Sequence, residues 1–175
     1  MKKRTSAGLV CIIAVLFVAS SQNLESQSPI HERHAKSGNT VSEVPGFAVK
    51  VSFSKKANDE LTSRSETVVV VGYLSGFPKL GTPKRLLDGQ IKDTIWLGEV
   101  EGEFMPGSLT TFNRIKLDQS RLKWVDHRGP QLLINVFSGR KSSPDNLLSC
   151  DTYEGSLQSV QGRDVEIFCK LIREQ

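Results

Sequence analysis

The chain has 175 residues, with 23 Lys and Arg against 19 Asp and Glu, and a formal net charge of +4. Lys2, Lys3 and Arg4 stand at the start of a leader-like segment, so the remainder carries about +1 (20 basic against 19 acidic side chains). No block of like charges is long enough to form a nucleic-acid-binding surface. We therefore expect no nucleic-acid partner.

Residues 1–20 predict a secretory signal peptide. A charged start is followed by an apolar run from Leu9 to Ala19 and then by small residues, which is the order found in such peptides. A membrane-spanning helix needs roughly 20 apolar residues, so no stable membrane insertion is expected. Cys11 follows Val10, which is not the small residue that a lipoprotein cleavage site requires. We expect an exported protein of a bacterial periplasm or the extracellular space.

Residues 21–44 predict a flexible polar leader, because apolar side chains occur there only singly. The string HERH places His31 and His34 three residues apart, a spacing that could ligate a metal on a helix. Two ligands without a third or fourth make a poor site. We therefore expect no metal in this protein.

Residues 45–175 are long enough for one domain with its own core. The string FAVKVSFS, residues 47–54, alternates apolar and polar side chains and predicts a half-buried strand. The continuous apolar run at 67–74 predicts a central strand covered on both faces. Further strands are expected at 94–104, 109–117, 121–125, 131–137, 147–153 and 165–172.

About eight short strands separated by Gly- and Pro-containing turns predict an all-β fold, a single antiparallel β-sandwich of immunoglobulin-like or transthyretin-like architecture. Residues 55–66 are expected to hold a single helical turn with Ala57 and Leu61 facing inward. Turns are expected at 127–130 and at 138–146, the second as a hairpin connection between two strands.

Two cysteines remain after export, and an exporting compartment favours their oxidation. If the last two strands pair antiparallel with Cys150 opposite Cys169, the same register places Leu148 opposite Leu171 and Tyr153 opposite Glu166. A cross-strand disulfide would close a loop of about 20 residues and stabilise the domain by about 3 kcal/mol. We expect a structural disulfide and not a reactive thiol pair.

No sequence motif points to catalysis. The chain lacks the nucleophile-elbow, phosphate-loop, dinucleotide-binding and C-x-x-C zinc patterns, and we expect no cofactor. His127 is the single histidine after residue 44, and its neighbour Asp126 would point to the opposite face of a strand. A hydrolase centred on His127 is therefore only a third hypothesis.

Two charged segments could bind a partner or an ion. Glu99, Glu101 and Glu103 alternate, so on a strand they share one face. They could form an acidic recognition stripe or hold a cation, or simply be the solvent face of the strand. The connection 76–89 could bind a carboxylate or phosphate, or be a solubilising loop. Its basic residues are Lys79, Lys84 and Arg85.

The string SGRKSSPDN, residues 138–146, is the expected contact loop. Gly139 permits positive φ and Pro144 presets φ, so the loop would present a basic tip close to the disulfide. The leading hypothesis is an exported, non-enzymatic protein-binding domain of inhibitor, immunity or accessory type. The alternative is a carbohydrate- or small-ligand-binding module in which Trp96 or Trp124 stacks on a sugar ring. The expected protein contacts are Arg140, Lys141, Asp145 and Asn146.

Overall fold

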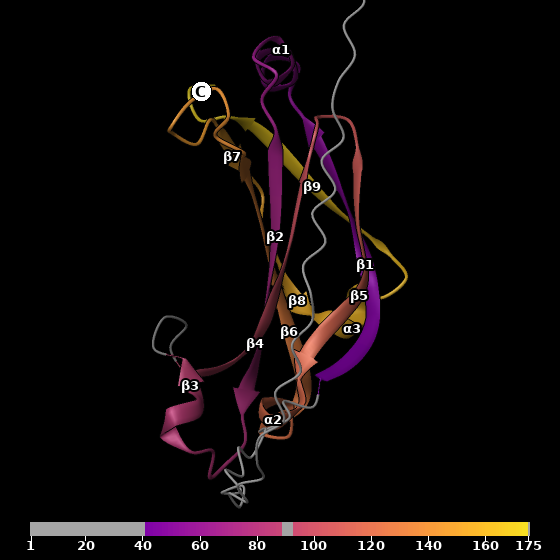
Figure 1. Cartoon of the computed structure of the whole chain (residues 1–175), viewed down its shortest axis with the longest axis vertical. Coiled ribbons are helices and arrows are strands. Elements are labelled where there is room, and N and C mark those ends of the chain that lie inside the picture. Colours follow the sequence, from indigo (N-terminus) through magenta and orange to yellow (C-terminus); the bar gives the residue numbers. More distant parts are fainter. Residues whose placement is uncertain (1–40, 89–92, 175) are drawn as a thin grey trace, which may run out of the picture. The chain divides into compact units, whose positions relative to one another are not determined.

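The computed structural model describes residues 41–88 and 93–174. The expected signal peptide and the leader up to residue 40, with Cys11, His31 and His34, lie outside these residues. Figure 1 shows an architecture dominated by long strands, with one helix of more than two turns at one end. Residue 41 already begins a strand, so residues 41–44, assigned above to the leader, belong to the folded part.

The elements follow one another along the chain with short connections. The helices are α1 (Lys55–Ser63), the 3-10 helix η1 (Lys84–Leu86), α2 (Gln119–Leu122) and α3 (Leu157–Val160). The strands are β1 (Val41–Phe53), β2 (Val68–Pro78), β3 (Leu87–Asp88), β4 (Thr94–Phe104), β5 (Leu109–Asp118), β6 (Val125–Ser138), β7 (Leu148–Cys150), β8 (Tyr153–Ser156) and β9 (Asp164–Leu171).

The strands form two sheets, which confirms the predicted β-sandwich. Sheet A has the order β5-β1-β9-β7, and sheet B has the order β3-β4-β2-β6-β8. Every pairing is antiparallel except that of β1 with β9, which is parallel. The sandwich is therefore not purely antiparallel, because the first and last strands lie side by side and run in the same direction.

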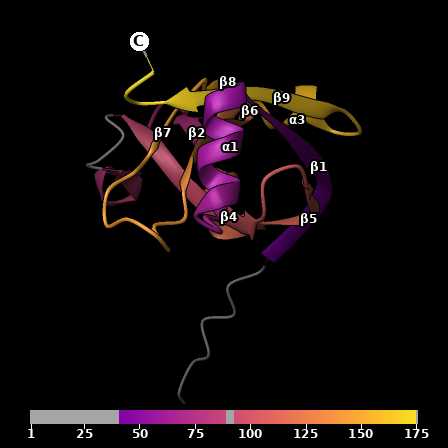
Figure 2. The same cartoon turned by 90° about the horizontal axis from the view of Figure 1, so that it is seen from above.

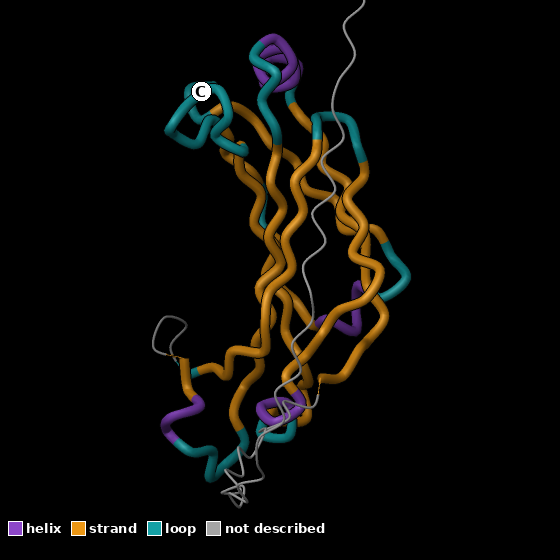
Figure 3. The backbone as a smooth tube through the Cα atoms, viewed as in Figure 1, coloured by secondary structure: helices purple, strands orange, loops and turns teal. Residues whose placement is uncertain are grey.

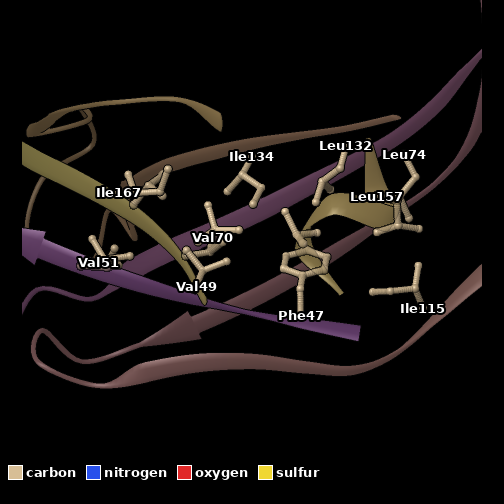
Figure 4. Close-up of a cluster of buried hydrophobic side chains, with 14 of the residues drawn as sticks. Phe47, Val49, Val51, Val70, Leu74, Ile115, Leu132, Ile134, Leu157 and Ile167 are labelled. Atoms are coloured by element: carbon tan, nitrogen blue, oxygen red, sulfur yellow. The ribbon is translucent and has the colours of Figure 1, made fainter. Parts of the chain in front are cut away.

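The inner faces of the two sheets supply the core. Alternate residues of β1, such as Phe47 and Val49, meet Val70 and Ile134 of sheet B and Ile167 of β9 in one continuous cluster (Figure 4). Fully burying such a side chain contributes about 1.5–3 kcal/mol relative to leaving it exposed. Burial of this alternating set is what holds the two sheets together.

Helix α1 closes one end of the sandwich. The Ser54 side chain accepts a hydrogen bond from the Ala57 backbone N–H at 3.0 Å and caps the first turn. Ala57 and Leu61, four residues apart, are completely buried, as expected. Seen from above, α1 lies over the space between the two sheets (Figure 2). The helix has nine residues, more than the single turn that was expected.

Two predictions for residues 119–130 are wrong. Residues 119–122 form α2 because the Asp118 side chain accepts the Ser120 N–H at 2.9 Å and caps a helical turn where a strand was expected. The expected turn at 127–130 lies inside β6, whose pairing with β2 is irregular between Gly76 and Pro78. This irregularity accommodates Gly129, at φ +69°, without ending the strand.

The predicted disulfide is confirmed. Cys150 and Cys169 are directly paired residues of β7 and β9, joined by an S–S bond of 2.03 Å, and Leu148 lies opposite Leu171. The predicted pairing of Tyr153 with Glu166 is wrong, because the chain leaves sheet A after Cys150. Tyr153 begins β8 and pairs with Ile134 of sheet B, where its ring packs against the core.

The segment 139–147 is not a hairpin, since it joins β6 of sheet B to β7 of sheet A. It lies at the same end as α1 and the C terminus, where Figure 3 shows the loops gathered. At this end the segment crosses from one sheet to the other. Its backbone conformation is therefore not set by hydrogen bonds between paired strands. Among the described residues no helix is long and apolar enough to cross a membrane.

Candidate protein-binding surface

The segment 139–147 is fixed to the sandwich by the buried carboxylate of Glu66. This side chain is fully shielded from solvent and follows α1. Its Oε1 accepts backbone N–H groups of Lys141 at 2.9 Å and Thr67 at 3.1 Å. Its Oε2 accepts the N–H of Ser142 at 2.7 Å and the Ser142 hydroxyl at 2.5 Å. Burial opposes ionisation, but these four hydrogen bonds hold the pKa of Glu66 below its ordinary value.

The start of the segment has an unusual backbone. Gly139 is needed for close approach, because a Cβ there would lie 1.9 Å from the Thr67 hydroxyl oxygen. The Gly139 N–H donates to the Thr67 carbonyl at 2.8 Å. The positive φ expected of Gly139 is found instead at Arg140, at +60°. The Glu66 hydrogen bonds to the next two residues hold Arg140 in this conformation.

Asn146 fixes the other end of the segment. Its Oδ1 accepts the backbone N–H groups of Ser138 at 2.9 Å and Leu148 at 3.1 Å. Its Nδ2 donates to the Leu148 carbonyl at 2.8 Å. The Asn146 amide is therefore engaged inside the protein, and it connects the end of sheet B to the start of β7.

The other three expected contact residues differ in their surroundings. Lys141 Nζ forms an ion pair with Glu103 of β4 at 3.0 Å, which directs its side chain toward sheet B. The side chains of Arg140 and Asp145 are exposed and form no hydrogen bond or ion pair with the described residues. Asp145 and Arg64 both line a cavity of about 300 Å³ that lies between the 139–147 segment, α1 and the C-terminal residues. The four residues therefore do not form one cluster.

The outer face of sheet B carries a set of apolar side chains that the sequence did not predict as a binding site. Its side chains are absent both from the core cluster and from the hydrophobic residues packed against that cluster. Val69 and Val71 are 7% and 4% exposed, and the others are half-buried. We call this set the outer patch: Val69, Val71, Tyr73, Phe77, Trp96, Leu133 and Phe137.

Strand register arranges the outer patch in rows. In one row, Tyr73 of β2 lies between Glu99 of β4 and Leu133 of β6, and Glu154 of β8 follows Leu133. In the next two rows, Val71 lies between Glu101 and Asn135, and Val69 lies between Glu103 and Phe137. Carboxylates thus border the apolar side chains of β2 and β6. The predicted shared face of the three glutamates is consistent with this register.

A β-bulge brings Trp96 onto the same outer face. Leu74 pairs with Gly98 but Ser75 pairs with Trp96, so Leu97 is the additional residue in β4. Gly98 has φ +140°, which favours glycine. Trp96 therefore shares a face with Glu99, although strict alternation would place them on opposite faces. Its ring centroid lies 5.9 Å from that of Tyr73.

The three carboxylates of β4 are not equivalent. Glu103 accepts hydrogen bonds from the Thr67 hydroxyl and the Lys141 amine, and these lower its pKa. Glu99 and Glu101 are exposed and form no ion pair with the described residues. Successive outward side chains of a strand lie about 7 Å apart, so the three carboxylates do not converge on one ion. The described ranges hold no group of three or more His, Cys, Asp or Glu that could bind a metal.

The second tryptophan is part of the structural framework. Trp124 packs against the core, and its carbonyl accepts the Lys79 N–H at 2.9 Å. The Lys79 amine donates to the Lys123 carbonyl at 2.8 Å. Trp124 and Lys79 thus join the 79–83 connection to the start of β6. Lys84 and Arg85 are exposed residues of η1.

Asp126, the neighbour of His127 in the sequence, is paired with Arg128. The Asp126 carboxylate accepts a hydrogen bond from the Arg128 backbone N–H at 2.9 Å. The Arg128 guanidinium also contacts this carboxylate, at 2.9 Å from Nε and 2.8 Å from Nη2. The Arg128 hydrogen bonds hold the pKa of Asp126 below its ordinary value. Arg128 also lies 3.6 Å over the Phe77 ring. The carboxylate nearest to His127 in the sequence is thus occupied by Arg128.

Comparison with known proteins yields no relative: no family model, curated protein or solved structure matches this chain.

Proposed function

We propose that this chain is an exported, non-enzymatic protein-binding domain of inhibitor, immunity or accessory type. Its binding surface is the outer patch, with Arg140 and Lys141 at the margin nearest α1. The observation that supports this most strongly is the placement of apolar side chains on a sheet face directed away from the core cluster.

An outer sheet face of this composition needs an explanation. An antiparallel sheet with one solvated face normally alternates apolar-in and polar-out. Here, Val69, Val71 and Tyr73 point outward from the central strand, and Leu133 and Phe137 flank them on β6. Val69 and Val71 are only 7% and 4% exposed, so the accessible apolar surface comes from the half-buried aromatic and leucine side chains around them. Contiguous apolar surface outside the core is typical of protein-binding sites, and aromatic residues contribute strongly to binding at such surfaces.

The anchored segment supports the same proposal. Because Glu66 and Asn146 hold its backbone at both ends, residues 140 and 141 are presented in one conformation next to the Val69 row. Preorganisation reduces the conformational entropy lost on binding. Export is supported by the predicted signal peptide and by the disulfide, which persists in oxidising compartments.

The proposal is tested by capture of partners from the exported fraction of the producing organism. The bait is the oxidised protein, compared with a Tyr73→Ser/Phe137→Ser variant and with the control Phe168→Ser on the outer face of sheet A. A second variant, Arg140→Ser/Asp145→Ser, tests the loop without disturbing Asn146. We expect one protein to be retained by the wild type and the control and lost by the outer-patch variant. Equal retention by all variants would exclude both surfaces.

A carbohydrate-binding function is the second candidate, and the Trp96–Tyr73 pair beside Glu99 favours it. An aromatic platform with a neighbouring carboxylate can stack on a sugar ring and accept its hydroxyl hydrogen bonds. A glycan array separates the two candidates. Binding that Trp96→Ala abolishes, together with no captured protein, would favour the carbohydrate function.

A further inference from the structure

We infer that the outer patch binds an amphipathic α-helix of another protein whose apolar stripe is flanked by Lys or Arg. This inference rests on the proposed function and adds the chemistry of the partner. It depends on three properties of the described residues: the width of the apolar stripe, the sign of the charges beside it, and its length.

The width of the stripe fits one helix. Its central side chains come from the neighbouring strands β2 and β6, with Val69 opposite Phe137 and Tyr73 opposite Leu133. Two adjacent strands are about 5 Å apart, so the stripe with its side chains is about 10 Å wide. A helix with its side chains has a similar diameter, about 10–12 Å.

The charges beside the stripe are negative on both sides. Glu99 and Glu101 line its β4 side, and Glu154 lies on its β8 side. All three are exposed, and none forms an ion pair with the described residues. Two basic side chains that contact this face, Lys141 and Arg128, already pair with Glu103 and Asp126. A helix with cations along both edges of its apolar stripe would satisfy these carboxylates.

The length of the stripe sets the length of the helix. The accessible side chains at the ends of the stripe on β6 are Leu133 and Phe137, both half-buried, and between them the strand rises about 14 Å, at about 3.4 Å per residue. A helix covers that distance with about nine residues, so apolar side chains at i, i+3, i+4 and i+7 would span it.

The charge pattern also disfavours a second copy of this chain as the occupant. Because both borders are acidic, face-to-face packing of two outer patches would place carboxylates against carboxylates in either orientation. Like charges brought together at an interface are unfavourable and suppress the wrong partner.

The test uses fluorescently labelled helical peptides of about 18 residues, which exceeds the nine needed for contact. One carries an apolar stripe flanked by Lys and Arg, a matched peptide replaces these by Glu, and a third scrambles the basic sequence so that the stripe is lost. Fluorescence anisotropy with the oxidised protein gives each Kd at low and at physiological salt. The protein variants are Glu99→Gln/Glu101→Gln, Tyr73→Ser/Phe137→Ser and the control Phe168→Ser.

We expect the basic amphipathic peptide to bind at least about tenfold more tightly than the acidic and scrambled peptides. The Glu99→Gln/Glu101→Gln variant should weaken its binding by about fivefold and reduce its salt dependence. The Tyr73→Ser/Phe137→Ser variant should abolish binding, and Phe168→Ser should leave it unchanged.

The possible failures are distinguishable. Equal affinity for the basic and acidic peptides, or an unchanged Kd in the glutamine variant, would overturn the inference. The proposed function would still stand if partner capture required Tyr73 and Phe137. If capture were independent of both residues, the proposed function would fail as well. A dimer in sedimentation that Phe137→Ser dissociates would identify a second copy as the occupant and also overturn the inference.

Discussion

The outer faces of the two sheets differ in the kinds of side chain that they carry. On sheet A, Lys50 and Glu166 lie opposite each other and form an exposed ion pair at 3.4 Å, and Phe168 is a solitary aromatic residue, 46% exposed. On sheet B, the outward side chains of the two central strands are Val69 and Val71, which are only 7% and 4% exposed, and the half-buried Tyr73, Leu133, Asn135 and Phe137. Both sheets have apolar inner faces, so the proposed function depends on this difference between the outer faces.

The two sheets are also secured differently. Sheet A has a covalent link between its edge strand β7 and β9. Sheet B continues into the 139–147 segment, which the Glu66 carboxylate holds. Glu66 is linked to the Val69 row by Thr67, whose backbone N–H donates to Glu66 and whose hydroxyl donates to Glu103. We interpret sheet A as the supporting layer and sheet B, with the 139–147 segment, as the binding layer. The following predictions test this difference, beginning with the largest expected effect.

Removing the disulfide should lower the stability of the fold without changing binding by sheet B. Cys150→Ser/Cys169→Ser should lower the free energy of unfolding by about 3 kcal/mol, because the unfolded chain regains the freedom of a loop of about 20 residues. This corresponds to a melting temperature lower by roughly 10 °C, measured by calorimetry. Peptide binding measured well below the transition should be unchanged. Loss of binding by the folded variant would contradict the division between the two layers.

Replacing Glu66 should loosen the binding layer. In Glu66→Gln, an amide replaces a carboxylate that accepts four hydrogen bonds, and we expect a loss of about 2 kcal/mol. The folded-state pKa of Glu66 is lowered, so its contribution is fully present above the unfolded-state pKa and is lost as pH falls through the folded-state value. Denaturant unfolding from neutral to acidic pH should therefore show the two proteins converging below about pH 4.5. A difference that stays constant with pH would show that Glu66 is not stabilised as a carboxylate.

A matched pair of phenylalanine substitutions compares the two outer faces directly. Phe137→Ser should destabilise the fold by about 1.5 kcal/mol, and Phe168→Ser by about half of that, because Phe168 is the more exposed. Partner capture should be lost only in Phe137→Ser. If capture were lost only in Phe168→Ser, the assignment of binding to sheet B would be reversed.

The smallest stability change is expected at the acidic border. Glu99→Gln/Glu101→Gln should change the free energy of unfolding by less than about 0.5 kcal/mol, as is usual for surface positions without specific partners. Chemical denaturation provides the measurement, and binding of the basic peptide should nevertheless weaken. Marked destabilisation would indicate that the two carboxylates serve the fold and not a partner.

The sequence by itself predicts the sandwich, the inward position of Ala57 and Leu61, and the Cys150–Cys169 bridge. These features depend on local periodicity and on the pairing of two nearby strands, which a single chain displays directly. The Val68–Val71 run also shows that β2 has apolar side chains on both faces. As predicted, β2 is central, between β4 and β6, and Val68 to Val71 are all at most 7% exposed. The run does not show that Val69 and Val71 lie outside the core cluster.

Only the tertiary structure decided how these segments combine. The crossing of residues 139–147 between sheets, the shift of Tyr153 into sheet B and the parallel pairing of β1 with β9 depend on contacts between distant residues. The same is true of the anchor, because Glu66 meets Lys141 and Ser142 across more than 70 positions of sequence. The bulge at Leu97 places Trp96 beside Glu99 against the alternation of the sequence. The physical reason is common to all of them: register, crossovers and buried hydrogen bonds are chosen by the packing of the whole domain.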